Sequence, residues 1–170
     1  RAAELRLNTG DTRDFQDGFK RARTNHPGQA EQLYGLEAEL LSEIDEKELA
    51  IEIYSEALDL LPESVSLLYG RAMTFEALDD ISGMESDLRA ILVFKPNNAT
   101  TLNALGYTLT VHTERYQEAA VLIEKALELS PGEPAILDSL GWVYFKLGRF
   151  LQAADLLKEA YARFPDAEVA

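Results

Sequence analysis

Few side chains in this 170-residue sequence have the types and spacing that catalysis needs. The two histidines, His26 and His112, each stand near the end of a predicted helix, where a surface or capping role explains them. The sequence has no cysteine, which excludes disulfides, thiolate metal ligands and cysteine nucleophiles. Asp138-Ser139 has no histidine nearby in sequence with which to form a catalytic triad. These residues favour a protein without catalytic residues.

Carboxylates are abundant, but their spacing suits turns better than metal or acid–base sites. Asp45-Glu46 and Asp79-Asp80 fall between predicted helices, where a solvated turn explains them better than a calcium site. No pair of residues has zinc-ligand spacing, and no glycine-rich phosphate loop occurs, so we expect neither metal nor cofactor. An enzyme with paired carboxylates would need two groups about 5–10 Å apart. Glu39 and Glu76 are its candidates, although neither has an evident acid–base partner.

Aromatic side chains offer better material, for binding rather than for reaction. Trp142 is the only tryptophan, and it directly follows Gly141, whereas Tyr144 is expected to fill the core at that turn. Tryptophan and tyrosine dominate binding hot spots, so Trp142 is a candidate anchor for a partner. The alternative is that a neighbouring or following segment of the protein buries it.

The overall charge restricts the class of partner. Thirty acidic residues against sixteen basic ones give a net charge of −14, of which residues 27–95 carry −12. Nucleic acids and anionic membranes are therefore not expected as main partners, because binding them requires basic patches. We interpret the acidity as a solvated surface, with a docking face for a basic partner as the alternative. No apolar run approaches the ~20 residues that a membrane span needs.

The prolines show an internal repeat. Five of the six are separated by 35, 34, 35 and 34 residues, at Pro27, Pro62, Pro96, Pro131 and Pro165. Small or apolar residues stand five and eight positions before each proline, and again twelve before. This i, i+4, i+7 pattern predicts one buried face of an α-helix that ends at the proline.

Each repeat predicts an antiparallel pair of helices, A and B, which cannot bury its apolar faces alone. The expected helices cover 30–43 and 46–60, 65–78 and 81–94, 99–112 and 115–129, and 134–146 and 149–163. A partial repeat precedes them, with a helix near 12–25 and a remnant at 2–8. The small residues Ala38, Ala72, Gly106 and Gly141 should let paired helices approach closely.

The segment Leu137-x2-Leu140-Gly141-x2-Tyr144, followed by Ala153-x3-Leu157 and Pro165, closely resembles the tetratricopeptide repeat. Leu102-x2-Leu105-Gly106-x2-Leu109 resembles it too, with one extra residue near 113–115. The resemblance implies an all-α, right-handed superhelical solenoid of about four and a half repeats that serves as a protein–protein interaction scaffold. As one domain over 1–170, it would comprise a partial repeat 1–27, repeats 28–62, 63–96, 97–131 and 132–165, and the start of a further helix at 166–170.

Two charged residues occupy positions where this family usually has leucine. Glu37 and Arg71 lie 34 residues apart, which is one repeat. Stacked A helices would place them side by side, and either charge buried alone would be costly. We predict an ion pair between them.

In such a stack the A helices line a concave groove, and the register predicts which residues face it. Beside Gly35 and Ser42, the candidate partner-binding residues are Glu39, Tyr69, Met73, Glu76, Asn103, Tyr107, Thr110, Asp138, Trp142 and Phe145. Relatives that clamp the acidic C-terminus of chaperones use lysine, arginine and asparagine here, so a carboxylate clamp is not expected. A ligand with apolar anchors and some basic residues would suit this groove.

The stretches 102–109 and 136–142 also resemble repeats of proteobacterial cell-envelope tetratricopeptide proteins. Several of these are outer-membrane lipoproteins that act as periplasmic adaptors. The resemblance implies a protein or peptide partner, for example a carboxyl-terminal-processing protease and its substrates, and no catalytic activity. Carbohydrate binding, to peptidoglycan or exopolysaccharide, is the alternative, because aromatic faces also stack on sugars.

The chain begins with Arg1 rather than Met, so we expect a piece of a longer protein. A periplasmic location with a missing N-terminal lipoprotein signal follows from the resemblance, with the cytoplasm as the alternative. The sequence leaves the oligomeric state open.

Overall fold

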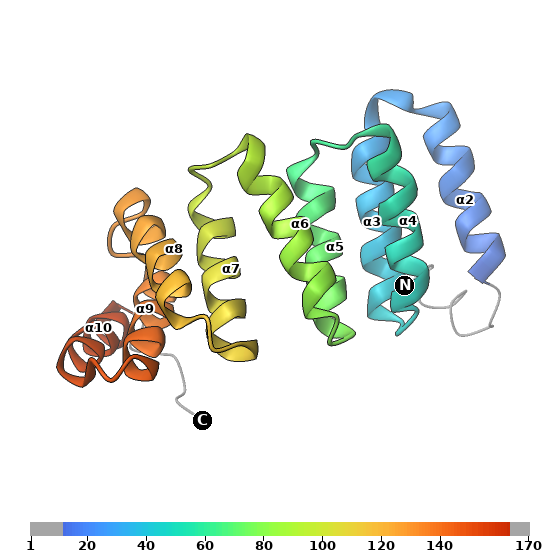
Figure 1. Cartoon of the computed structure of the whole chain (residues 1–170). Coiled ribbons are helices and arrows are strands. Elements are labelled where there is room, and N and C mark those ends of the chain that lie inside the picture. The colour runs from blue at the N-terminus through green and yellow to red at the C-terminus, as the bar shows by residue number, and fades with distance from the viewer. Residues whose placement is uncertain (1–11, 164–170) are drawn as a thin grey trace. The chain divides into compact units, whose positions relative to one another are not determined.

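The computed structural model describes residues 12–163, and every regular element in this range is helical (Figure 1). The elements are α2 (Thr12–Asn25), the short 3-10 helix η1 (Pro27–Gln29), α3 (Ala30–Glu43), α4 (Lys47–Leu60), α5 (Val65–Ala77), α6 (Ile81–Phe94), α7 (Ala99–His112), α8 (Tyr116–Leu129), α9 (Pro134–Lys146) and α10 (Phe150–Arg163). Each boundary lies within one residue of the expected one. The expected helix at 2–8 and the start of a helix at 166–170 lie outside the described residues.

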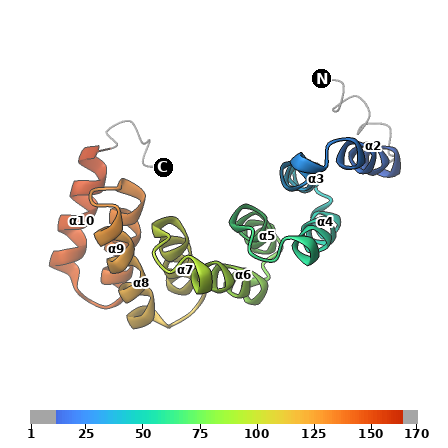
Figure 2. The same ribbon diagram turned by 90° about the horizontal axis from the view of Figure 1, so that it is seen from above.

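The chain divides into two compact units, with the boundary inside α6 between Asp87 and Leu88. In unit 1, up to Asp87, α3 packs against α4 and α5, and α2 packs against α3. In unit 2, from Leu88, α7 pairs with α8 and α9 with α10, and α9 also packs against α7 and α8 (Figure 2). The expected single solenoid over 1–170 stays a prediction.

Paired helices approach closely where the sequence places a glycine. A Cβ atom added to Gly106 of α7 would lie 2.4 Å from Ile123 Cγ1 and 3.0 Å from the carbonyl oxygen of Ala119, both on α8. A Cβ atom on Gly141 of α9 would lie 2.7 Å from Leu157 Cγ of α10. The expected role of these glycines in helix packing is confirmed in unit 2.

The turns between A and B helices differ in one repeat. Three of them place a residue in the left-handed region, at Asp45 (φ 69°), Asp79 (φ 59°) and Gly148 (φ 75°). This conformation ends a helix compactly by satisfying its last carbonyl groups. The α7–α8 turn instead continues through Thr113 in an extended conformation, with φ −140° and ψ 177°.

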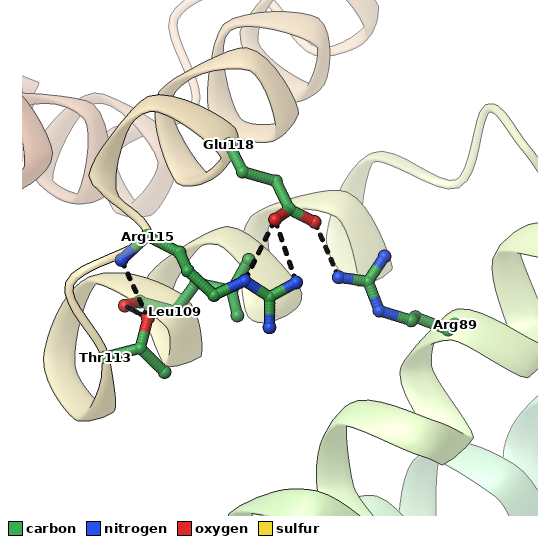
Figure 3. A network of polar contacts seen from close by, with 5 residues as sticks. All are labelled: Arg89, Leu109, Thr113, Arg115 and Glu118. Atoms are coloured by element: carbon green, nitrogen blue, oxygen red, sulfur yellow. Dashed lines mark hydrogen bonds and ion pairs between the residues drawn. The ribbon is translucent and has the colours of Figure 1, made fainter.

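This turn has three residues, 113–115, like the other A–B turns, and polar contacts hold it together (Figure 3). The hydroxyl of Thr113 donates to the carbonyl oxygen of Leu109 and accepts from the backbone N–H of Arg115 at 3.0 Å. The Arg115 side chain donates to Glu118 at 2.8 and 3.0 Å, and Arg89 donates to Glu118 at 2.6 Å. Hydrogen bonds from Arg89 and Arg115 lower the pKa of Glu118. A local network therefore links α6, α7 and α8 within unit 2, and the extra residue expected near 113–115 does not lengthen the turn.

The predicted ion pair between Glu37 and Arg71 is wrong. Glu37 is fully buried on α3 and pairs with Arg23 of α2, whose guanidinium lies 3.9 Å from the centre of the Tyr34 ring. Both residues find their partners on B helices instead of along the stack of A helices, because the leucine position points toward the B layer.

Arg71 of α5 connects three helices. Its Nε and Nη2 atoms each donate to one carboxylate oxygen of Asp87 on α6 at 2.8 Å, and its Nη1 donates to Ser55 Oγ on α4 at 2.9 Å. Side chains of Arg71 and Asp87 are 20% and 5% exposed, so the pair is largely removed from water. A single guanidinium thus replaces the apolar contacts that Leu105 and Leu140 make at the same repeat position.

We expect Arg71→Ala to destabilise the chain by about 3 kcal/mol, because it leaves the buried carboxylate of Asp87 without its partner. The double variant Arg71→Leu/Asp87→Leu should lie within about 1 kcal/mol of wild type, because it removes both charges and restores the apolar pattern of unit 2. Urea unfolding followed by circular dichroism measures both. A double variant as unstable as Arg71→Ala would show that the pair itself, rather than an isolated charge, sets the stability.

The buried carboxyl group of Glu37 should make the free energy of unfolding depend on pH. Burial raises the pKa of this carboxyl above 4.5, although the hydrogen bond from Arg23 opposes the shift. Its protonated form is therefore favoured in the fold, and its contribution to stability is complete below pH 4.5 and decreases as pH rises through the folded pKa. The unfolding free energy of wild type relative to Glu37→Gln should fall as pH rises above 4.5. Parallel pH profiles of the two proteins would contradict the assignment.

Candidate functional site

The ten expected partner-binding residues fall in both units, and the structure exposes them to different degrees. In unit 1, Glu39 is exposed, whereas Tyr69, Met73 and Glu76 are half-buried. In unit 2, the exposed ones are Asp138, Tyr107 (41%), Trp142 (37%) and Phe145 (48%). Asn103 is half-buried, and Thr110 is buried. Among these ten, the exposed aromatic residues all lie on α7 and α9 of unit 2.

Thr110 was expected in the groove, and the structure corrects this placement. Its side chain is 1% exposed, and its hydroxyl donates to the carbonyl oxygen of Gly106 at 2.8 Å. The last turn of α7 is buried on this side, so Thr110 contributes to packing instead of to a binding surface. Asn103 is also constrained, because its Oδ1 is shielded from solvent and accepts no hydrogen bond within residues 12–163.

The aromatic residues of α9 form a continuous exposed cluster. The rings of Trp142 and Phe145 stack with their centres 5.5 Å apart and an angle of 11° between their planes. Phe150, at the start of α10, meets Phe145 edge-on at 5.6 Å and is 61% exposed. Lys146 places its Nζ atom 4.8 Å from the centre of the Trp142 ring. A well-ordered apolar surface with a cation at its side is therefore open to solvent.

Tyr144 was expected to fill the core beside Trp142, and it does so only in part. Tyr144 is half-buried, and its hydroxyl donates to Glu124 of α8 at 2.8 Å. Burial and this hydrogen bond raise the pKa of Tyr144. Arg149 lies over the same ring at 4.9 Å. Tyr144 thus connects α9 to α8, which leaves Trp142 on the outer face.

A second exposed apolar pair lies on α7, the helix that packs against α9. Tyr107 and Val111 are 41% and 45% exposed and stand four residues apart, so they share one face of the helix. Val111 was not among the expected site residues, although its i, i+4 spacing from Tyr107 was visible in the sequence. That Tyr107 and Trp142 line a common hollow stays a prediction.

The described residues offer little to other kinds of site. Between residues 12 and 163, no group of three or more histidine, aspartate or glutamate side chains could hold a metal ion. None of the helices in this part of the chain is long and apolar enough to cross a membrane. The exposed aromatic faces of α7 and α9 are therefore the strongest candidate site.

Known proteins support the repeat and the fold. Residues 98–166 match the tetratricopeptide repeat family. The TPR repeat-containing protein PA4667 of Pseudomonas aeruginosa is 44% identical over 170 residues, and the chain spans 29% of its length.

Two solved structures share the fold at low sequence identity. A tetratricopeptide repeat protein from Parabacteroides merdae matches with a TM-score of 0.79 and 15% identity, over 98% of this chain and 65% of that one. MamA from Desulfovibrio magneticus matches with a TM-score of 0.74 and 16% identity, over 98% and 93% of the two chains. These likenesses confirm the expected all-α fold class. Residues 98–166 thus belong to the tetratricopeptide repeat family, and the described helices before them share its fold.

Proposed function

We propose that this chain is a protein–protein interaction scaffold that binds a partner segment on the exposed faces of α7 and α9. The observation that supports this most is the stacking of Trp142 on Phe145. Their side chains are 37% and 48% exposed, whereas the opposite face of α9 is buried. Large aromatic residues that stay open to solvent on a rigid helix are typical of binding hot spots.

The polar surroundings indicate what such a segment contains. Asp138 is exposed four residues before Trp142, so it lies on the same face of α9 one turn earlier. Tyr107 and Val111 extend the apolar surface on the neighbouring helix. A segment with apolar side chains over Trp142 and Phe145 and a basic side chain near Asp138 would complement this face. Glu39, Met73 and Glu76 present similar chemistry in unit 1, and we propose the same role for them.

A protein partner is favoured over carbohydrate by the contacts of Trp142. Sugar binding by aromatic residues needs an open ring face, and the Trp142 ring already stacks on Phe145 and carries Lys146 beside it. The same contacts preorganise the rings for apolar side chains, which lowers the entropic cost of binding a segment.

We further propose that the full-length protein is a periplasmic adaptor, with a carboxyl-terminal-processing protease and its substrates as candidate partners. Support comes from the resemblance of residues 102–109 and 136–142 to envelope proteins of this kind. Affinity purification from bacterial envelope extract with the full-length protein, followed by mass spectrometry, would identify the partner.

Trp142→Ala and Phe145→Ala should each weaken binding to the purified partner at least tenfold, because they remove the apolar anchors of the site. Isothermal titration measures the affinities, and circular dichroism checks that the helical content is unchanged. Tyr161→Ala is the matched control, since Tyr161 is 56% exposed on α10 and lies outside the proposed face. Unchanged affinity in both α9 variants would place the binding surface elsewhere. A saturable change in Trp142 fluorescence on titration with peptidoglycan fragments would favour the carbohydrate alternative.

A further inference from the structure

The turn between α9 and α10 carries an exposed patch that is both apolar and basic. We define this edge patch as Lys146, Arg149, Phe150 and Leu151. Phe150 is 61% exposed and Leu151 is 85% exposed, and the side chain of Arg149 is 46% exposed. Lys146 is exposed as well. The patch continues directly from the aromatic face of α9, because Phe150 contacts Phe145 edge-on.

The other repeats show that the position of Leu151 is exposed even where further helices follow. Leu151 stands fourteen residues before its repeat proline, and the residues at that position in earlier repeats are Glu48, Ser82 and Gln117. All three are exposed, although further helices follow them. This position therefore faces solvent in each of these described repeats, and among them only the repeat of α9 and α10 fills it with a large apolar side chain.

The charge at the same place also departs from the rest of the chain. The corresponding turns of unit 1 are acidic, with a net charge of −3 over residues 43–48 and −3 over residues 76–82. Residues 139–154, in contrast, contain no acidic residue and two basic ones, in a protein with a net charge of −14. Basic side chains are thus concentrated beside the exposed apolar ones.

Contacts on the aromatic rings hold both cations at this surface. Lys146 lies over Trp142 at 4.8 Å, and Arg149 lies over Tyr144 at 4.9 Å. The nearest carboxylate is that of Glu124, 4.0 Å from Arg149, and both side chains are more than 40% exposed. An ion pair this long and this exposed is worth little, so an incoming carboxylate can compete for Arg149.

We propose that the edge patch binds an acidic stretch of the partner polypeptide, with an apolar side chain seated against Phe150 and Leu151. This deepens the proposed function and rests on it. The partner segment then lies along α9 with a basic end at Asp138, apolar residues at Trp142 and Phe145, and an acidic end at the turn. Anionic membranes would satisfy the same cations, but a chain with a net charge of −14 is repelled from such a surface.

Two fluorescently labelled probe peptides test the charge assignment on the whole chain. Both contain leucine and phenylalanine anchors, and one ends in three glutamates where the other ends in three glutamines. Fluorescence anisotropy should show the glutamate probe binding at least tenfold more tightly, with a preference that decreases as salt is raised. Lys146→Glu should reduce this preference at least fivefold, and Leu151→Gln should weaken both probes severalfold.

Lys158→Glu is the matched control, because it makes the same charge change at an exposed position farther along α10. An equal loss in Lys146→Glu and Lys158→Glu, or equal affinity for the two probes, would overturn the acidic-partner assignment while leaving the proposed function intact. Failure of both probes to bind wild type, together with normal partner binding by Trp142→Ala, would instead overturn the proposed function. If the protein sediments with phosphatidylglycerol vesicles and Lys146→Glu abolishes this, the ligand of the edge patch is an anionic membrane, and the proposed polypeptide ligand is overturned.

Discussion

The distance of closest approach between paired helices is the constraint on which the fold depends. At Gly106 and Gly141 the neighbouring helix lies so close that a Cβ atom would overlap Ile123 or Leu157. Only small residues permit this separation, which lets Ile123 of α8 and Leu157 of α10 pack against the backbone of the paired helix. Pairing buries one face of each helix. The side chains that stay exposed on α7 and α9, such as Tyr107 and Trp142, are therefore available to bind other molecules.

The two units solve the same packing problem with different chemistry. Unit 1 buries Glu37 and Arg71 where unit 2 buries Leu105 and Leu140. A buried charge is stable only beside its partner, so Arg71 requires Asp87 of α6 and Ser55 of α4 within hydrogen-bonding distance. Unit 1 thus has a hydrogen-bonding requirement at this repeat position that unit 2 does not have.

The sequence predicted most of the fold, because prolines at a constant spacing end each B helix and helical periodicity identifies the buried face between them. It could not predict the partners of Glu37 and Arg71, since a repeat period aligns positions but does not reveal toward which layer a side chain points. The burial of Thr110 was missed for the same reason. Leu151 was missed because exposure depends on a comparison with Glu48, Ser82 and Gln117, whose environments only a structure reveals.

The stacking of the only tryptophan on Phe145 has a practical consequence. Trp142 belongs to unit 2, so tryptophan emission, excited selectively over tyrosine, reports on the second half alone, while the ellipticity of the chain averages over both halves. If the charged first half melts at a lower denaturant concentration than the leucine-rich second half, the two signals will change at different midpoints. The molecule therefore carries an intrinsic probe that distinguishes stepwise melting from a single concerted transition.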